Sequence, residues 1–205
     1  MNVHKPSTAD RIKEAALNLF LDSGYDGTSL SDIAKAVGIK TPSLYAHFES
    51  KAQLFLQLFH DVIAEDLNKF RRLYESMQGE PALQQFRRMF DFYVDNNAQS
   101  VGQTFLRQTF LLPPRHLREQ LKKDFLQYEQ ESTELIVSVY RQGLERGVFR
   151  LTDEEQMIAT LYACSDGLLV ERQIYDRELF NSRKEQAWQS LLFLLTTDLT
   201  KGQEA

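Results

Sequence analysis

The sequence predicts an all-α protein of about nine helices. Along most of the chain, apolar residues recur at the 3.6-residue spacing of an amphipathic helix. The 205 residues include 14 phenylalanines but only 9 glycines and 5 prolines, which disfavours a turn-rich β fold. Several predicted helices also begin with a Ser or Thr followed three residues later by Asp, Glu or Gln, which is a helix-start signal. A chain of this length can bury one or two hydrophobic cores.

The first three predicted helices are short and closely spaced. Their expected bounds are 8–22, 30–37 and 42–47. A capping box at Ser7–Asp10 starts the first helix, and Gly24 ends it. Gly38 lies where the second helix must stop and the chain must turn sharply, while Thr41 caps the third helix and Pro42 fits its first turn. Two short helices around a tight turn are typical of a helix-turn-helix DNA reader.

Longer helices are predicted for the rest of the chain. Their expected bounds are 51–76, 81–97, 100–111, 115–146, 153–175 and 183–200. Pro113-Pro114 ends the sixth helix, and we expect Thr152 and Ser182 to cap the eighth and ninth. The start of the long fourth helix divides the chain into a helix-turn-helix DNA-binding domain, 1–50, and a helical ligand-sensing and dimerisation domain, 51–205.

Composition and charge narrow the cellular setting. The single cysteine, Cys164, excludes an internal disulfide and suits a reducing cytoplasm. No apolar run approaches the length of a membrane span and the N-terminus lacks a signal core, so we expect a cytoplasmic protein without a membrane segment. The net charge is −5, yet residues 1–51 contain six basic and six acidic side chains. The predicted DNA-binding part is therefore neutral, and helix N-termini, hydroxyls and a few cations would bind phosphate.

A gapless run from about residue 10 to residue 55 carries a recognisable set of residues. They are Gly24-Tyr25, Thr28-Ser29, Ile33-Ala34, Val37-Gly38-Ile39, Ser43-Leu44-Tyr45, His47-Phe48, Ser50-Lys51 and Leu54. In order and spacing this run resembles the tetracycline-repressor (TetR) family of transcriptional regulators. The rest of the chain resembles the family in length, helical pattern and the segment from Gly143 to Phe149. The resemblance implies a DNA-binding N-terminal domain and a C-terminal domain that senses a ligand and dimerises.

The candidate DNA-binding residues fall into two groups. Those expected near the groove-facing ends of the second and third helices are Ser31, Lys40, Thr41 and Ser43. Among these, Lys40 can donate to guanine O6 or N7, and the Thr41 methyl can contact a thymine methyl. The residues that the resemblance places on phosphates are Thr28, Tyr45, His47 and Lys51. We expect Leu44 and Phe48 in the core; in the alternative interpretation Thr28 is only a cap and Tyr45 only packs on Phe48.

The last two predicted helices favour a homodimer. The run Leu191–Leu195 is apolar around the whole helix, so we expect it to be buried on every side. Ala159, Ala163 and Gly167, four residues apart, form a smooth face that permits close helix approach. The resemblance implies that helices eight and nine of two copies form a four-helix bundle across a two-fold axis. Alternatively, the ninth helix is only the centre of a monomeric core.

Helices four to eight are expected to enclose an apolar pocket for a small-molecule effector. The candidate polar liners are Tyr93, Gln103, Arg107, Gln108, Tyr128, Tyr162 and Asp166. Asp91, Asp95 and Asp166 favour a cationic effector whereas Arg107 favours an anionic one, so the sequence leaves the charge of the effector open.

These observations predict a dimeric regulator that represses a gene from a double-stranded DNA operator until a small-molecule effector releases it. The alternatives are an activator of the same fold and a helical module that binds a protein instead of DNA. We expect no catalytic residues, metal or cofactor, because the chain lacks a phosphate-binding Gly-rich loop and a nucleophile elbow. Metal-ligand spacing is likewise absent among Cys164 and the histidines His4, His47, His60 and His116.

Overall fold

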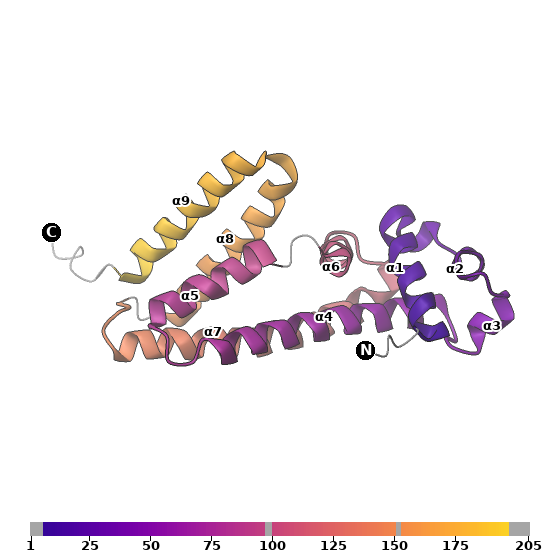
Figure 1. The fold of residues 1–205 in the computed structure, drawn as a ribbon, viewed down its shortest axis with the longest axis horizontal. Helices are drawn as coiled ribbons and strands as arrows, with labels where there is room; N and C mark the ends of the chain where they lie inside the picture. The colour runs from indigo at the N-terminus through magenta and orange to yellow at the C-terminus, as the bar shows by residue number, and fades with distance from the viewer. Residues whose placement is uncertain (1–5, 97–99, 151–152, 197–205) are drawn as a thin grey trace, which may run out of the picture. The chain divides into compact units, whose positions relative to one another are not determined.

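The computed structural model describes residues 6–96, 100–150 and 153–196, which form nine α-helices, two short helical turns and no strand (Figure 1). The all-α prediction is therefore confirmed. The elements are α1 Thr8–Gly27, α2 Leu30–Val37, α3 Thr41–Tyr45, α4 Lys51–Ser76, α5 Ala82–Asp91, the π-helical turn η1 Phe92–Asn96, α6 Val101–Leu111, the 3₁₀ turn η2 Arg115–Leu117, α7 Arg118–Glu145, α8 Glu154–Ile174 and α9 Arg177–Thr196. In the described part of the chain, none of these helices has the length and hydropathy needed to cross a bilayer.

Packing separates the chain into two compact units. The first unit comprises Met1–Asp66 and Gln99–Tyr128, and the second comprises Leu67–Ala98 and Glu129–Ala205. Both α4 and α7 therefore contribute residues to each unit. The predicted boundary after residue 50 separates functions rather than packed cores, and it stays a prediction.

The core of the first unit is built from the apolar faces of short helices. Ile12, Ala16 and Phe20 form the buried stripe of α1, as their helical spacing predicts. They pack with apolar residues of α2, α3, α4, α6 and α7 in one cluster. Leu44 and Phe48, on either side of the end of α3, are both buried in this cluster. The core thus fixes one side of α3 and leaves the other side to solvent.

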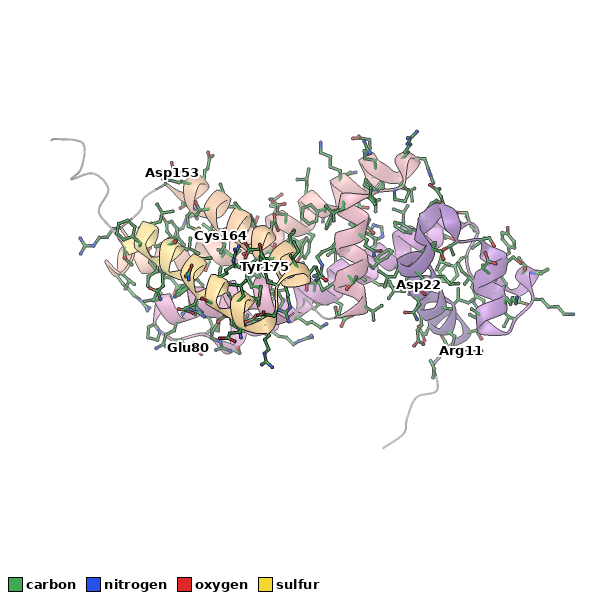
Figure 2. All side chains as sticks on the ribbon, turned by 90° about the horizontal axis from the view of Figure 1, so that it is seen from above. Arg11, Asp22, Glu80, Asp153, Cys164 and Tyr175 are labelled. Atoms are coloured by element: carbon green, nitrogen blue, oxygen red, sulfur yellow. The ribbon has the colours of Figure 1, made fainter. Side chains whose placement is uncertain are left out.

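The second unit has a separate, aromatic-rich core. Its members include Phe86, Tyr140, Phe149 and Trp188, contributed by α5, α7, the segment after α7, and α9. The ring of Phe149 lies directly against Gly143 of α7, where an added Cβ would come within 2.0 Å of the ring. Figure 2 labels the single cysteine, Cys164, on α8; its side chain is half-buried.

The helix starts predicted for α3 and α9 are wrong. Thr41 is the first residue of α3, and the preceding Lys40 makes no side-chain cap because lysine has no acceptor. Pro42 does occupy the first turn, as predicted. The predicted cap of α9, Ser182, lies inside the helix. The helix begins at Arg177 because the Asp176 carboxylate accepts a hydrogen bond from the backbone N–H of Leu179, the third residue of α9 (2.9 Å).

Other helix ends agree with the sequence or refine it. The Ser7–Asp10 capping box is present, and Gly24 interrupts α1 with a left-handed φ of 71° before one further turn reaches Gly27. Asp153 caps α8 by accepting from the Gln156 backbone N–H at 3.0 Å, whereas the predicted cap, Thr152, lies outside the described residues.

Candidate functional site

The helix-turn-helix is held by caps at both ends of α2. Ser29 and Asp32 form the predicted capping box, in which each side chain accepts from the backbone N–H of the other (3.1 and 3.0 Å). The Ser29 hydrogen bonds lower the pKa of Asp32. Gly38 ends the helix with a left-handed φ of 76°. From α1, the Arg11 guanidinium donates to the Val37 carbonyl at 2.6 Å, so α1 fixes the C-terminal end of α2.

Helix α3 presents its polar residues to solvent. Its core side is fixed by the buried Leu44 and Phe48, and the residues between them are exposed. The Tyr45 side chain is 53% exposed although its ring is apolar over most of its surface. The predicted DNA-binding residues that are exposed on α2, α3 and their flanks are Ser31, Lys40, Ser43, Tyr45 and His47, and Thr41 is half-buried. This surface offers hydroxyls, one ammonium and one imidazole beside a short helix.

Two other predicted DNA-binding residues have partners within the protein. Thr28 is buried, and its hydroxyl lies 2.8 Å from the Gly24 carbonyl. The Lys51 ammonium donates to the carbonyls of Tyr25 (2.6 Å) and Thr28 (2.8 Å), and it also lies 4.2 Å from the centre of the Tyr25 ring. Both side chains therefore hold the connection between α1 and α2. Contact of either with phosphate stays a prediction.

Tyr25 also joins this connection to η2. Its hydroxyl lies 3.1 Å from His116 Nε2, and the two ring centres are 5.3 Å apart. Burial and the nearby Asp26 carboxylate raise the pKa of Tyr25. Sequence reasoning missed this contact because 91 positions separate the two residues and neither belongs to a pattern that pairs them.

The predicted effector-binding residues lie in two places, one in each unit. In the first unit, Gln103 of α6 donates to the buried carboxylate of Asp66 at 2.7 Å, and the Tyr128 hydroxyl of α7 donates to the other oxygen of the same carboxylate. Arg107 is half-buried, with a guanidinium nitrogen 3.3 Å from the hydroxyl of a threonine on the same helix, and Gln108 is exposed. Sequence reasoning missed Asp66, the residue that joins α4 to α6 and α7.

The second group surrounds Tyr162 of α8. Its hydroxyl lies 2.7 Å from that of Thr133 on α7, and its ring meets the Tyr93 ring edge to face with centres 5.9 Å apart. Tyr93 comes from η1, the π-helical turn, and such turns often occur at functional sites. Burial raises the pKa of Tyr162. Asp166 lies one helical turn after Tyr162 and retains an exposed surface in the single chain.

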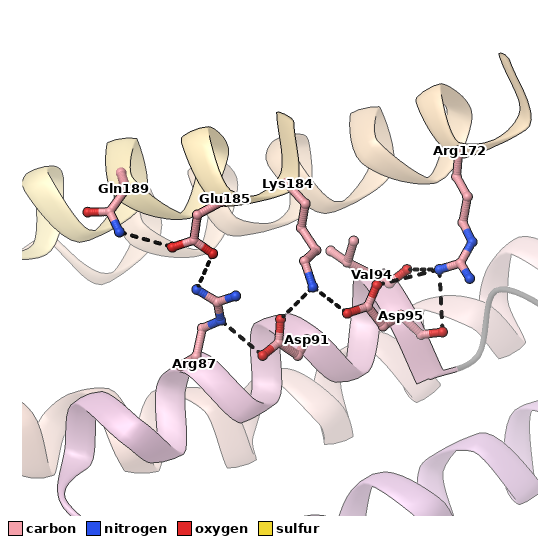
Figure 3. A network of polar contacts seen from close by, with 8 residues as sticks. All are labelled: Arg87, Asp91, Val94, Asp95, Arg172, Lys184, Glu185 and Gln189. Carbon is pink, nitrogen blue, oxygen red and sulfur yellow. Dashed lines mark hydrogen bonds and ion pairs between the residues drawn. The ribbon is translucent and has the colours of Figure 1, made fainter. Parts of the chain in front are cut away.

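Figure 3 shows that Asp91 and Asp95, which the sequence offered to a cationic effector, are bound to cations of the protein itself. Lys184 Nζ lies 2.5 Å from an oxygen of Asp95 and 3.4 Å from one of Asp91. Arg87 Nε donates to Asp91 at 2.9 Å, and Arg172 lies 3.5 Å from the Asp95 carboxylate. These two carboxylates are therefore already compensated, and neither supports a cationic ligand.

An apolar surface is exposed on α8 and α9 of the single chain. Leu191 and Leu195 are buried in the second core, but Phe193 between them is 66% exposed. Burial of this run on every side therefore requires a second copy and stays a prediction, while the alternative that α9 is only the centre of a monomeric core does not fit the exposed Phe193. Other large apolar side chains exposed on α8 and α9 are Val170, Ile174 and Leu179. The small residues Ala159, Ala163 and Gly167 are exposed as well.

The comparisons with known proteins agree with this geometry. Residues 12–58 match the family model described as bacterial regulatory proteins, tetR family. A biofilm operon icaADBC HTH-type negative transcriptional regulator, IcaR of Staphylococcus aureus strain Newman, is 54% identical over 48 residues, which are 23% of this chain and 26% of that protein. The chain thus matches about a quarter of the length of this curated relative. Residues 12–58 therefore carry a helix-turn-helix of the type found in bacterial regulatory proteins of the tetR family.

Solved structures extend the likeness of fold to nearly the whole chain. The TetR family regulator PfmR from Thermus thermophilus has a TM-score of 0.67 at 20% identity, covering 93% of this chain and 97% of that one. The regulator FadR from Bacillus subtilis, in complex with stearoyl-CoA, has a TM-score of 0.67 at 16% identity, covering 92% and 98%. Within the described residues, no three His, Cys, Asp or Glu side chains lie together as metal ligands would.

Proposed function

We propose that the protein is a dimeric DNA-binding transcriptional regulator, and that it represses its target until a small-molecule effector releases it from the operator. The observation that carries the proposal is the exposed outer side of α3, whose inner side is fixed in the core by Leu44 and Phe48. A short helix that is anchored on one side and polar on the other can enter a major groove. We propose repression rather than activation because the staphylococcal relative is a negative transcriptional regulator.

The exposed residues divide into base readers and phosphate contacts. Lys40 immediately precedes α3, and Thr41 and Ser43 lie in its first turn; with Ser31 of α2 they would contact base edges. Tyr45 and His47 follow and are placed to grip phosphate. Residues 1–51 have no net charge, so we expect each copy to make only a few ionic contacts with phosphate. Thr28 and Lys51 then act chiefly by holding the connection between α1 and α2.

Dimerisation doubles the few base pairs that one copy can contact. We infer that α8 and α9 of two copies form a four-helix bundle, because Ile174 and Phe193 are 67% and 66% exposed in the single chain. The small residues of α8 allow its backbone to approach a partner helix closely. An exposed apolar patch on such helices is typical of a protein interface.

The effector would act through the spacing of the two recognition helices. Paired readers must match the DNA repeat of about 34–36 Å or a multiple of it. Helix α4 begins beside the helix-turn-helix and ends in the second unit, so a ligand that prefers one pose of α4 would change that spacing. This function requires no catalytic site or cofactor, and it places the protein in the cytoplasm, where a bacterial operator is accessible.

The test is binding to DNA sequences that are selected from a random pool by the full-length protein. We expect saturable binding that weakens steeply with salt. Replacing Tyr45 with Ala should weaken binding at least about tenfold, which corresponds to the loss of one good contact. The matched control is Leu126→Ala on α7, since Leu126 is 52% exposed and Tyr45 53%. Equal affinities of wild type and the Tyr45 variant would contradict the assigned surface, and absence of any selected sequence would contradict DNA binding.

A further inference from the structure

Helices α7 and α8 pair in a regular antiparallel register. Near one end of the pair, Arg141 of α7 donates to Glu154 of α8 at 2.7 Å. Farther along, the hydroxyls of Thr133 and Tyr162 meet at 2.7 Å. The next positions that face each other are one turn before Thr133 on α7 and one turn after Tyr162 on α8. Those positions are Glu129 and Asp166, so this register sets two carboxylates against each other.

The two carboxylates lack a compensating charge. Burial and the charge of Asp166 raise the pKa of Glu129, and burial raises the pKa of Asp166. Within the described ranges, no arginine or lysine forms an ion pair with either side chain. This contrasts with Arg141 and Glu154, the complementary pair in the same register. Glu129 is half-buried and Asp166 is exposed in the single chain. Like charges that face each other raise the free energy of the folded chain, so a cation bound between them would lower it.

The surroundings of the pair suit an organic cation. Tyr162 lies between the two helices, and the Tyr93 ring meets it edge to face at 5.9 Å. The face of a tyrosine ring attracts a cation that lies within about 6 Å of the ring centre. Ser165, three residues after Tyr162, lies with Leu161 and Leu168 in the buried stripe of α8, and its hydroxyl has no hydrogen-bond partner among the described residues. Buried polar groups are almost always hydrogen-bonded, so a water molecule or a ligand atom is expected to complete this one.

We propose that Glu129, Asp166, Tyr93 and Tyr162, here called the carboxylate–tyrosine cluster, bind an organic cation with an aromatic or alkyl body. A metal ion is a poor occupant, because two carboxylates are too few ligands and no third His, Cys, Asp or Glu joins them within the described residues. The inference resolves the charge of the effector that the sequence left open. That the bound cation acts as the effector rests on the proposed function, whereas binding of the cation to the isolated protein does not.

The experiment measures the binding of ligands that differ in charge, using calorimetry on the full chain without DNA. The probes are benzyltrimethylammonium, its uncharged carbon isostere neopentylbenzene, the anion phenylacetate, and the larger cation tetraphenylphosphonium. We expect saturable binding of at least one cation and at least about tenfold weaker binding of the other two classes. Glu129→Gln and Asp166→Asn should each weaken cation binding at least about tenfold, because each removes one of the two charges.

The matched control is Glu134→Gln, which removes a carboxylate on an exposed position of α7. It should leave cation affinity unchanged, and circular dichroism should show all three variants to be folded. Preferential binding of phenylacetate, no saturable binding of either cation, or equal losses in the Glu134 variant would overturn the proposal. If the neutral variants change only the dimer dissociation constant, the pair belongs to the subunit interface and the proposal is wrong. Failure of DNA binding in wild type would instead count against the proposed function alone.

Discussion

Gly143 is restricted to glycine by its neighbour rather than by its backbone. A Cβ at this position would lie 2.0 Å from the Phe149 ring, far closer than two carbon atoms approach. The carbonyl of Gly143 also accepts the backbone N–H groups of Val148 (2.8 Å) and Phe149 (3.1 Å), so the ring cannot retreat without breaking the turn after α7. This contact gives a physical reason for the Gly143-to-Phe149 segment that the sequence marks.

Gly143→Ala should therefore lower the free energy of unfolding by about 1–3 kcal/mol, as overpacking of a core does. Denaturant unfolding followed by far-UV circular dichroism measures this change. In the background of Phe149→Leu the same substitution should cost less, because the smaller side chain leaves room for the added methyl group. An equal cost in both backgrounds would show that the ring is not the cause.

Lys51, which the sequence predicts to contact phosphate, already has partners within the protein. Its ammonium binds two carbonyls of the connection between α1 and α2. Lys51→Met should destabilise the free protein by about 1–3 kcal/mol, the worth of hydrogen bonds to a charged group. Thermal unfolding without DNA measures this effect, with Lys35→Met, an exposed lysine of α2, as the control. Weaker DNA binding with unchanged thermal stability would instead identify Lys51 as a phosphate contact.

At the scale of the element, the bounds of a helix could be predicted from the sequence where the residues that cap it lie within a few positions of its ends. The bounds of α2 agree with the prediction, because the capping box and Gly38 act within a few residues of the helix they delimit. The start of α9 was missed because Asp176 caps it immediately after α8, where no break in the polar pattern separates two helices. The π-helical turn η1 was not predicted, because the helical spacing of the sequence does not distinguish it from the end of α5; its Asp95 contacts Lys184 of the distant helix α9.

The pairing of α7 with α8 predicts a distinctive dependence of stability on pH. A carboxyl group whose pKa is raised by folding favours the folded state at low pH, and this advantage is lost as the pH rises through the raised pKa. Glu129 and Asp166 both have raised pKa values. Glu129→Gln should therefore gain stability relative to wild type between about pH 4 and pH 7, as measured by denaturant unfolding across that range.

The control for this trend is again Glu134→Gln, whose stability relative to wild type should not vary with pH in the same direction. Carboxylates with lowered pKa values, such as Glu154 beside Arg141, act in the opposite sense and stabilise the chain as the pH rises. They are present in every variant, so the difference between wild type and variant isolates the Glu129 contribution. A constant difference across the range would show that the two carboxylates do not interact.

At the scale of the whole molecule, the exposed apolar surface of α8 and α9 predicts how two copies meet. Phe193→Asp should convert a dimer into a monomer, because it places a charge in the centre of the proposed apolar interface. Light scattering coupled to gel filtration measures the mass. Leu112→Asp is the control, since Leu112 is 85% exposed at the end of α6, outside α8 and α9. A dimeric mass for the Phe193 variant, or a monomeric one for wild type, would refute the interface.

The candidate DNA-binding surface could be predicted from the sequence far better than the candidate effector-binding residues. The former is contiguous in the chain, so spacing alone places Ser43 and Tyr45 on the outside of α3 and Leu44 on the inside. The latter are assembled from helices that are distant in sequence, as when Asp66 meets Gln103 and Tyr128. Periodicity shows that such residues lie on helices, but it does not show which helix faces which. The opposition of Glu129 and Asp166 required the register of two paired helices.

The two carbonyls bound by Lys51 have a consequence for chemical modification of the protein. An amine is acylated only when its nitrogen lone pair is free, and acylation of Lys51 would break the two hydrogen bonds that its ammonium donates at 2.6 and 2.8 Å. Lys40 is exposed at the start of α3. Of these two lysines, Lys40 is therefore the one that acetylation would reach, which would remove a positive charge from the proposed DNA-binding surface and leave the hydrogen bonds of Lys51 intact.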